Sequence, residues 1–271
     1  MAVTHGFIIN EAATSVTAPL TATAGLQVVV GTAPVNMLDD PAAAVNTPMI
    51  VRSYKEAVEA AGYSDDFEDY TICEAVNASF QVMNVGPLVL INVLDPAKHT
   101  TAVEETTVQV NDGVAEVDVT GLLLAKLVVK KEATELTADV DYAATFNDDG
   151  TVSIALIEGG AGDGATQLLV SGTKLDPSKV TADDIVGGVS ISTGAETGLE
   201  VVRQVYPKIG YVPGILLAPR FSRNANVCAA LQAKCRSINS VFNCVCFVDI
   251  DSTAEGAVKY QDVEAQKVAQ A

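Results

Sequence analysis

The residues in this sequence that could do chemistry are acidic side chains placed at the ends of apolar runs. Asp95 follows the apolar run 88–94, and Asp249 and Asp251 stand at the end of the run 244–250. An acidic residue at the carboxyl end of a strand in an open α/β sheet can bind a metal or act as a general base. Acidic residues also occupy this position as helix caps and turn formers. The sequence favours caps and turns, with a cytosolic α/β enzyme using these three residues as the alternative.

Other groups that could support catalysis are scarce. The chain holds two histidines, His5 and His99, which leaves little material for a catalytic triad or dyad. His99 lies among loop-forming residues, so we expect its side chain to be solvated. The glycine-rich segment 159–164 lies between two predicted strands, whereas a phosphate-binding loop joins a strand to the N-terminus of a helix. We therefore expect a hairpin loop there, no catalytic or cofactor-binding residue, and no cofactor.

The five cysteines are arranged as two pairs and a single residue, Cys73. Cys228 and Cys235 lie seven residues apart on a predicted helix and share one of its faces. Cys244 and Cys246 alternate along a predicted strand and share one face of it. Structural zinc sites favour closer spacings with more ligands nearby. We expect buried, reduced thiols without a metal or a disulfide.

Composition and charge narrow the class of protein. The net charge is −18, with 16 Lys and Arg against 34 Asp and Glu, so the clustered cations that nucleic acids and anionic membranes require are missing. The first residues lack the pattern of a secretory signal, and no apolar run reaches the ~18 residues of a membrane helix. With 49% hydrophobic residues, the chain is expected to fold around a sizeable core in the cytoplasm.

The elements that would position these residues alternate between strands and helices. Ser53 and Glu56 have capping-box spacing, and Gly62 is a stop signal, so we expect a helix between them. Further helices are predicted over residues 69–84, 181–185, 196–206, 226–238 and from about 252 to the end. Predominantly apolar character predicts strands buried on both faces over residues 88–94, 214–219 and 244–250. The fold class is therefore α/β, with a mixed or parallel sheet and flanking helices.

A central segment, residues 103–175, has a period of two instead. Hairpin turns are indicated at 111–113 and at 147–150, each between short alternating strands. We expect a small, sandwich-like all-β module inserted into the α/β domain, which then consists of residues 25–102 and 176–271. Residues 1–24 are predicted to form an extended N-terminal arm. Within the arm, Phe7, Ile8 and Ile9 form a strand-like run without an obvious local partner.

Several stretches, taken together and in order, resemble the tail sheath family of contractile phages and R-type bacteriocins. They are residues 25–34 (GLQVVVGTAP), 46–51 (NTPMIV), 62–67 (GYSDDF), 91–96 (INVLDP), 173–181 (TKLDPSKVT) and 212–219 (VPGILLAP). The order and spacing of these pieces cover nearly the whole chain. Sheath proteins of this type continue past the point where this chain stops, so we expect it to lack the C-terminal part.

The resemblance implies a structural protein and not an enzyme. Sheath subunits of phage or bacteriocin particles polymerise around a tail tube, donate terminal strands to neighbouring subunits, and contract on a signal from the baseplate. This implies that the chain is made in the bacterial host cytoplasm and placed in the virion tail. Its partners would be other sheath subunits, the tail tube protein and the baseplate. Phe7, Ile8 and Ile9 would then form the inter-subunit arm that drives helical assembly.

Overall fold

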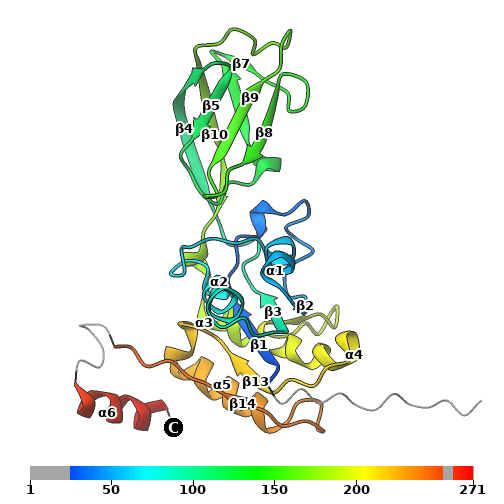
Figure 1. Ribbon diagram of the computed structural model, residues 1–271, viewed down its shortest axis with the longest axis vertical. Helices are drawn as coiled ribbons and strands as arrows, with labels where there is room; N and C mark the ends of the chain where they lie inside the picture. Colours follow the sequence, from blue (N-terminus) through cyan, green and yellow to red (C-terminus); the bar gives the residue numbers. More distant parts are fainter. Residues whose placement is uncertain (1–24, 253–258, 271) are drawn as a thin grey trace, which may run out of the picture.

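The computed structural model describes residues 25–252 and 259–270. The predicted arm, with Phe7, Ile8 and Ile9, lies outside the described residues. The described part is elongated, with a five-stranded α/β region at one end and a seven-stranded antiparallel sheet at the other (Figure 1). The expected combination of strands and helices is therefore confirmed, while the domain boundaries stay a proposal.

Three strands of the five-stranded sheet, β3, β13 and β14, come from the predicted apolar runs. Its strand order is β14-β13-β1-β3-β2, with bounds β1 (Gln27–Gly31), β2 (Met49–Val51), β3 (Leu88–Asn92), β13 (Ile215–Leu217) and β14 (Val245–Cys246). All neighbours run parallel except β2, which is antiparallel to β3. Every residue of β3 is buried, as expected for a strand covered on both faces. The strand predicted over 244–250 is much shorter, because the chain leaves the sheet after Cys246.

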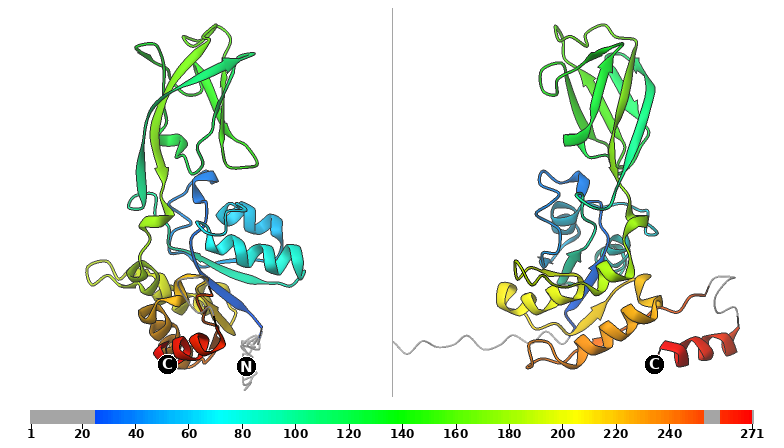
Figure 2. Two further views of the ribbon diagram at one scale, coloured as in Figure 1. Left: turned by 90° about the vertical axis from the view of Figure 1, so that its left-hand side faces the viewer. Right: turned by 180° about the vertical axis from the view of Figure 1, so that it is seen from behind.

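Helices cover both faces of this sheet. The helices of this region are α1 (Tyr54–Ala61), α2 (Thr71–Val76), α3 (Ala182–Val186), α4 (Val205–Ile209), α5 (Ala225–Arg236) and α6 (Tyr260–Gln270), of which α6 packs against α5. Short 3-10 segments are η1 (Val35–Met37), η4 (Pro177–Lys179), η5 (Gly198–Gln204) and η6 (Phe221–Arg223), and β11 (Gly188–Val189) pairs with β12 (Glu196–Thr197). In Figure 2, α1 and α2 lie on one side of β1, and α4 and α5 lie on the other.

Two helix predictions need correction and one is refined. The helix predicted over 196–206 is a 3-10 helix followed by α4, with β12 occupying its first two positions. The helix predicted over 69–84 is split into α2 and the π-helical η2 (Asn77–Val82). At α1 the Ser53 hydroxyl accepts a hydrogen bond from the Glu56 amide (3.2 Å), as predicted. The Glu56 carboxylate, however, accepts from the Arg52 amide (2.9 Å) and not from the Ser53 amide.

The seven-stranded sheet takes up residues 100–175. Its order is β7-β6-β10-β4-β5-β9-β8, with bounds β4 (Thr100–Asn111), β5 (Val114–Val117), β6 (Val128–Lys131), β7 (Thr134–Glu135), β8 (Tyr142–Phe146), β9 (Val152–Leu156) and β10 (Gln167–Leu175). Asp112 and Gly113 join β4 to β5 with positive φ at both residues, which is the type I′ geometry of a two-residue hairpin. The second predicted hairpin joins β8 to β9. A single 3-10 turn, η3 (Leu124–Lys126), interrupts the strands among these residues.

Each region has its own hydrophobic core. Val29, Leu90 and Leu216 belong to a cluster built around the five-stranded sheet. Ile154 and Leu168 belong to a separate cluster enclosed by the strands of the seven-stranded sheet. The chain passes between the two regions at a neck formed by the start of β4 and the end of β10 (Figure 1).

Candidate functional site at the edges of the five-stranded sheet

Asp95 is held in a turn at the end of the β3 segment. Its carboxylate accepts a hydrogen bond from the Ala97 amide (2.8 Å), and its own amide donates to Nδ1 of His99 (2.9 Å). This is the turn-forming role that the sequence favours for an acidic residue at a strand end.

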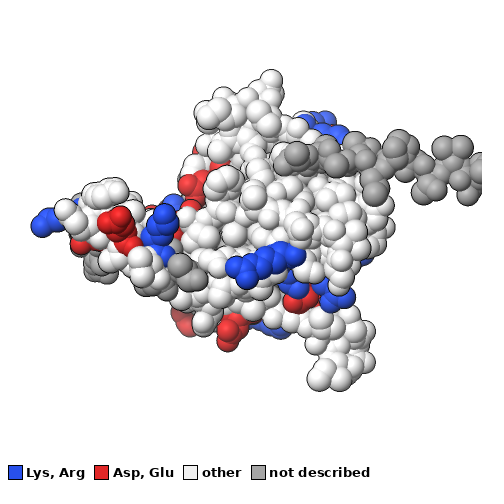
Figure 3. Space-filling view, turned by 90° about the horizontal axis from the view of Figure 1, so that it is seen from below, with Lys and Arg blue, Asp and Glu red and all other residues white. Residues whose placement is uncertain are grey.

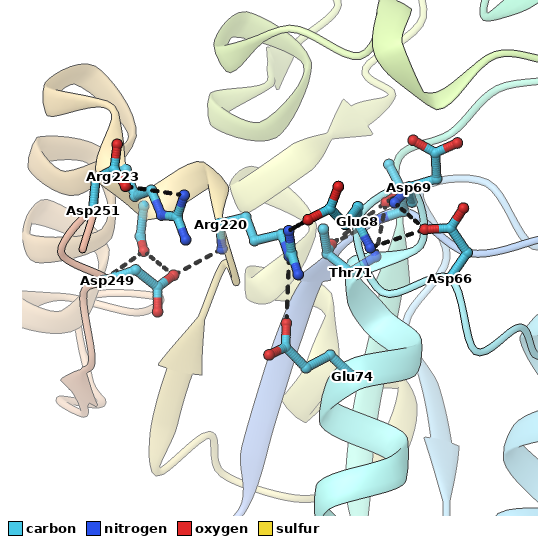
Figure 4. Close-up of polar contacts among 11 residues, drawn as sticks. Asp66, Glu68, Asp69, Thr71, Glu74, Arg220, Arg223, Asp249 and Asp251 are labelled. Carbon is cyan, nitrogen blue, oxygen red and sulfur yellow. Dashed lines mark hydrogen bonds and ion pairs between the residues drawn. The ribbon is translucent and has the colours of Figure 1, made fainter. Parts of the chain in front are cut away.

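Asp249 joins the segment after β14 to the segment after β13. Its carboxylate accepts hydrogen bonds from the Arg220 amide (2.8 Å) and the Ser222 hydroxyl (2.7 Å), and its amide donates to the same hydroxyl (2.9 Å). The Asp251 carboxylate lies 3.7 Å from the Arg223 guanidinium (Figure 4). These contacts are of the turn-forming kind that the sequence favours for an acidic residue at a strand end.

The three acidic residues do not converge on one site. Asp95 lines one small hollow, together with His99 and Asp184, and Asp249 lines a different one beside Arg220. In the described part of the chain, no group of three or more His, Cys, Asp or Glu residues could hold a metal ion. The geometry therefore offers the acidic enzyme alternative no support.

Arg220 is the centre of a charged network at the carboxyl ends of the parallel strands. Its guanidinium lies 3.4 Å from the Glu68 carboxylate and 3.6 Å from the Glu74 carboxylate (Figure 4). These two ion pairs connect the end of β13 to α2 and to the segment before α2. Its φ of +65° is the left-handed region, which is unusual for a residue with a side chain. The Asp249 carboxylate, by binding the Arg220 amide, helps to hold this backbone conformation. The network therefore stabilises the sheet edge.

A second polar network ties α2 to β1. The Thr32 hydroxyl donates to the Asp69 carbonyl (2.6 Å) and accepts from the Thr71 amide (3.1 Å). The Asp66 carboxylate accepts from the Asp69 amide (3.2 Å). Burial, followed by the nearby charge of Asp66, raises the pKa of the Asp69 carboxyl. These contacts fix where α2 begins.

The expectation that His99 is solvated is wrong. The side chain is 7% exposed, and its Nε2 lies 3.6 Å from the Asp184 carboxylate. Asp184 also accepts hydrogen bonds from the Thr181 amide (2.9 Å) and hydroxyl (2.7 Å) at the start of α3. Because Asp184 lies beyond the seven-stranded sheet in the sequence, no local signal near His99 reveals this partner.

Among the residues that the structure describes, β2 and β14 are the edge strands of the sheet, each paired with a strand on one side. Apolar side chains near β14 are unusually exposed: Val245 by 55%, Phe247 by 63% and Val241 by 73%. Seen from this end of the molecule, much of the surface is uncharged, with a Lys or Arg side chain lying across its centre (Figure 3). An edge strand with unpaired backbone groups and exposed apolar side chains can accept a strand from another chain. Sequence patterning missed this feature, because a continuous apolar run predicts a strand covered on both faces.

Sequence comparison with known proteins indicates which class of protein this chain resembles. No family model matches the chain. It is 29% identical over 214 residues to the tail sheath protein of Burkholderia phage BcepMu, an alignment that covers 78% of this chain. The chain is therefore similar to a phage tail sheath protein. The resemblance found in the sequence is thereby confirmed.

The similarity covers less than half of the BcepMu tail sheath protein. The aligned segment spans 42% of the BcepMu sheath protein. In the part of this chain that the structure describes, no helix is long and apolar enough to cross a membrane. A structural, phage-related protein is the reading that this similarity supports.

Proposed function

We propose that this chain is part of a structural subunit that assembles with copies of itself into a contractile tail sheath. The similarity to the BcepMu tail sheath protein is the observation that carries this proposal. In this function the subunits surround a tail tube, and the sheath shortens on a signal from a baseplate to drive the tube through the host envelope. The protein is made in the bacterial host cytoplasm and becomes a component of the virion tail or of a related bacteriocin-like particle.

The open edge at β14 is the acceptor that we propose for inter-subunit contact. β14 pairs with β13 on one side, and Val245 and Phe247 are more than half exposed. The donor we propose is the N-terminal run Phe7, Ile8 and Ile9 of a neighbouring subunit. A donated apolar strand would satisfy the edge backbone groups and cover these side chains, which provides both affinity and register. Head-to-tail donation of this kind builds an open helical assembly.

Electron microscopy of the complete gene product tests the sheath function. We expect tubes or stacked rings, and a monodisperse monomer across micromolar concentrations would contradict it. The proposed acceptor is tested with Val245→Asp, which places a charge on the edge. The matched control is Val140→Asp, which alters a similarly exposed valine (61%) in the seven-stranded region.

The two variants test the proposed β14 acceptor independently of the proposed sheath function. We expect Val245→Asp to abolish tubes while leaving the far-UV spectrum and unfolding midpoint close to those of the unaltered protein, and Val140→Asp to leave tubes intact. Tubes that persist in Val245→Asp would exclude the β14 edge as the acceptor, and the proposed sheath function would still stand.

A further inference from the structure

Four of the five cysteines gather between α5 and β14. Cys228 and Cys235 come from α5, and Cys244 and Cys246 come from the β14 segment. The Cys235 thiol is hydrogen-bonded to the sulfur atoms of both Cys244 and Cys246. Cys228 lies near Cys246, and its own sulfur accepts a hydrogen bond from the Gln232 amide group (3.4 Å).

The backbone places Cys235 and Cys244 directly beside each other. The Cys244 amide donates a hydrogen bond to the Cys235 carbonyl (3.0 Å). A backbone hydrogen bond between two residues brings their Cα atoms within several ångströms of each other, and a disulfide bridges Cα atoms about 4.4–6.8 Å apart. The interaction between the two thiols indicates that their side chains point toward each other.

Access to solvent differs between the two residues. Cys228 and Cys235 are buried, whereas Cys244 and Cys246 are partly exposed. A small reagent from solution can therefore reach Cys244 first, and the buried Cys235 lies next to it. This is the arrangement of an attacking and a resolving thiol.

We propose that Cys235 and Cys244 form a redox site, which closes to an intramolecular disulfide on contact with a low-molecular-weight disulfide such as oxidised glutathione. The Cys244 thiolate attacks one sulfur of the reagent, breaks its S–S bond and releases one glutathione thiolate. Cys235 then loses its proton and attacks the Cys244 sulfur of the mixed disulfide, forming the protein disulfide and releasing the second glutathione thiolate. Two protein thiols are oxidised, one glutathione disulfide is reduced, and the two protons end on the released glutathione thiols.

The electrostatics of the cluster match these roles. The hydrogen bond from the Cys235 thiol lowers the pKa of Cys244, and the same bond, together with burial, raises the pKa of Cys235. Cys235 also lies in the last turn of α5, where the helix dipole disfavours a thiolate. Burial, followed by the charge of Cys235, raises the pKa of Cys246 to about 11, so Cys246 stays a thiol and competes poorly as a nucleophile.

The bridge would act on the open edge of the sheet. Between the two cysteines the chain turns back on itself, with hydrogen bonds of 2.8 and 3.0 Å between Ile238 and Phe242. β14 comprises two residues and is held by β13 on one side. A Cys235–Cys244 disulfide would fasten this short edge strand to α5. Oxidation is therefore expected to rigidify the surface that carries Val245.

The test is a thiol count on the folded protein after incubation with oxidised glutathione at pH 8. We expect the number of free thiols, measured after denaturation, to fall from the five in the sequence to three, and dithiothreitol to restore it. Peptide mapping should find Cys235 linked to Cys244, and the thermal midpoint should rise on oxidation. Cys244→Ser should lose no pair of thiols, whereas Cys73→Ala, which alters the cysteine in α2, should still lose two.

Several outcomes would overturn the proposal. They are an unchanged thiol count, a bridge that uses Cys246 in place of Cys244, and a mixed disulfide on Cys244 that never resolves. Mapping of the unaltered protein decides between these results even if a cysteine variant fails to fold.

Discussion

Thr100 and Leu175 are direct cross-strand partners at the neck, where the chain enters and leaves the seven-stranded sheet. Their Cα atoms are therefore on the order of 5 Å apart, and the Asp176 amide donates to the His99 carbonyl (2.8 Å) just below them. A few residues are enough to reconnect the chain at this point.

We predict that the seven-stranded region can be removed without unfolding the α/β region. Replacing residues 101–174 with a short Gly/Ser linker should leave a soluble protein with one cooperative urea transition, because loop closure adds only ~0.6 kcal/mol per doubling of length. Some loss of stability is expected, since Leu123 packs into the α/β core and the Asn36 side-chain amide donates to the Leu122 carbonyl (3.3 Å). A molten or insoluble product would contradict the prediction.

The separate cores predict separate effects of cavity-forming substitutions. Leu216→Ala and Leu168→Ala each remove a fully buried side chain, from the α/β core and the seven-stranded core respectively. Each should destabilise its own region by about 2–5 kcal/mol. Native-state hydrogen exchange is the measurement: Leu168→Ala should weaken protection in β9 and leave β3 unchanged, with the reverse for Leu216→Ala. Equal loss of protection in both strands would mean that the regions unfold as one unit.

Asp176 predicts how stability at the neck depends on pH. Hydrogen bonds from the Ser178 hydroxyl and then the Thr101 hydroxyl lower the pKa of its carboxyl. A carboxyl whose pKa is lower in the folded state stabilises the fold above its unfolded value of about 4, and this contribution is lost as the pH falls through the folded pKa. In urea titrations at pH 7 and pH 3, Asp176→Asn should therefore show a smaller difference in the free energy of unfolding than the unaltered protein.

The control for Asp176→Asn is Asp148→Asn, at an exposed turn position between β8 and β9. It should show the same pH dependence as the unaltered protein. An Asp176→Asn variant with undiminished pH dependence would assign the acid sensitivity to other carboxyl groups.

The acidic residues at the sheet edge are predicted to matter for stability and not for chemistry. Asp249→Ala leaves the Ser222 hydroxyl and the Arg220 amide without their acceptor, so unfolding free energy should fall by about 1–3 kcal/mol. Asp251→Asn weakens a partly exposed ion pair with Arg223, which is worth about 0–1 kcal/mol. Urea denaturation measures both, and a chelator should leave the unaltered protein unchanged. Stabilisation by a divalent metal that disappears in Asp249→Ala would instead favour the enzyme alternative.

Much of the local structure is determined by the sequence itself. The all-apolar stretch around Leu90 predicts a strand buried on both faces, and β3 is one. Asp112 and Gly113 predict a tight hairpin, because both positions need positive φ, and they form it. The Ser53 cap and the Gly62 stop bound α1 as predicted. These features depend on residues within a few positions of one another, so periodicity and turn chemistry are sufficient to find them.

The tertiary structure alone decides which of these elements meet. Each cysteine pair shares a face of its own element, but only the packing of α5 against β14 brings Cys235 to Cys244. His99 has loop residues around it in sequence, yet Asp184 from α3 covers it. β14 ends early because Asp249 bonds to the Arg220 segment instead of continuing the strand. In each case the partner is distant in the chain, and the energy that selects it comes from burial and hydrogen bonds formed once the sheet has assembled.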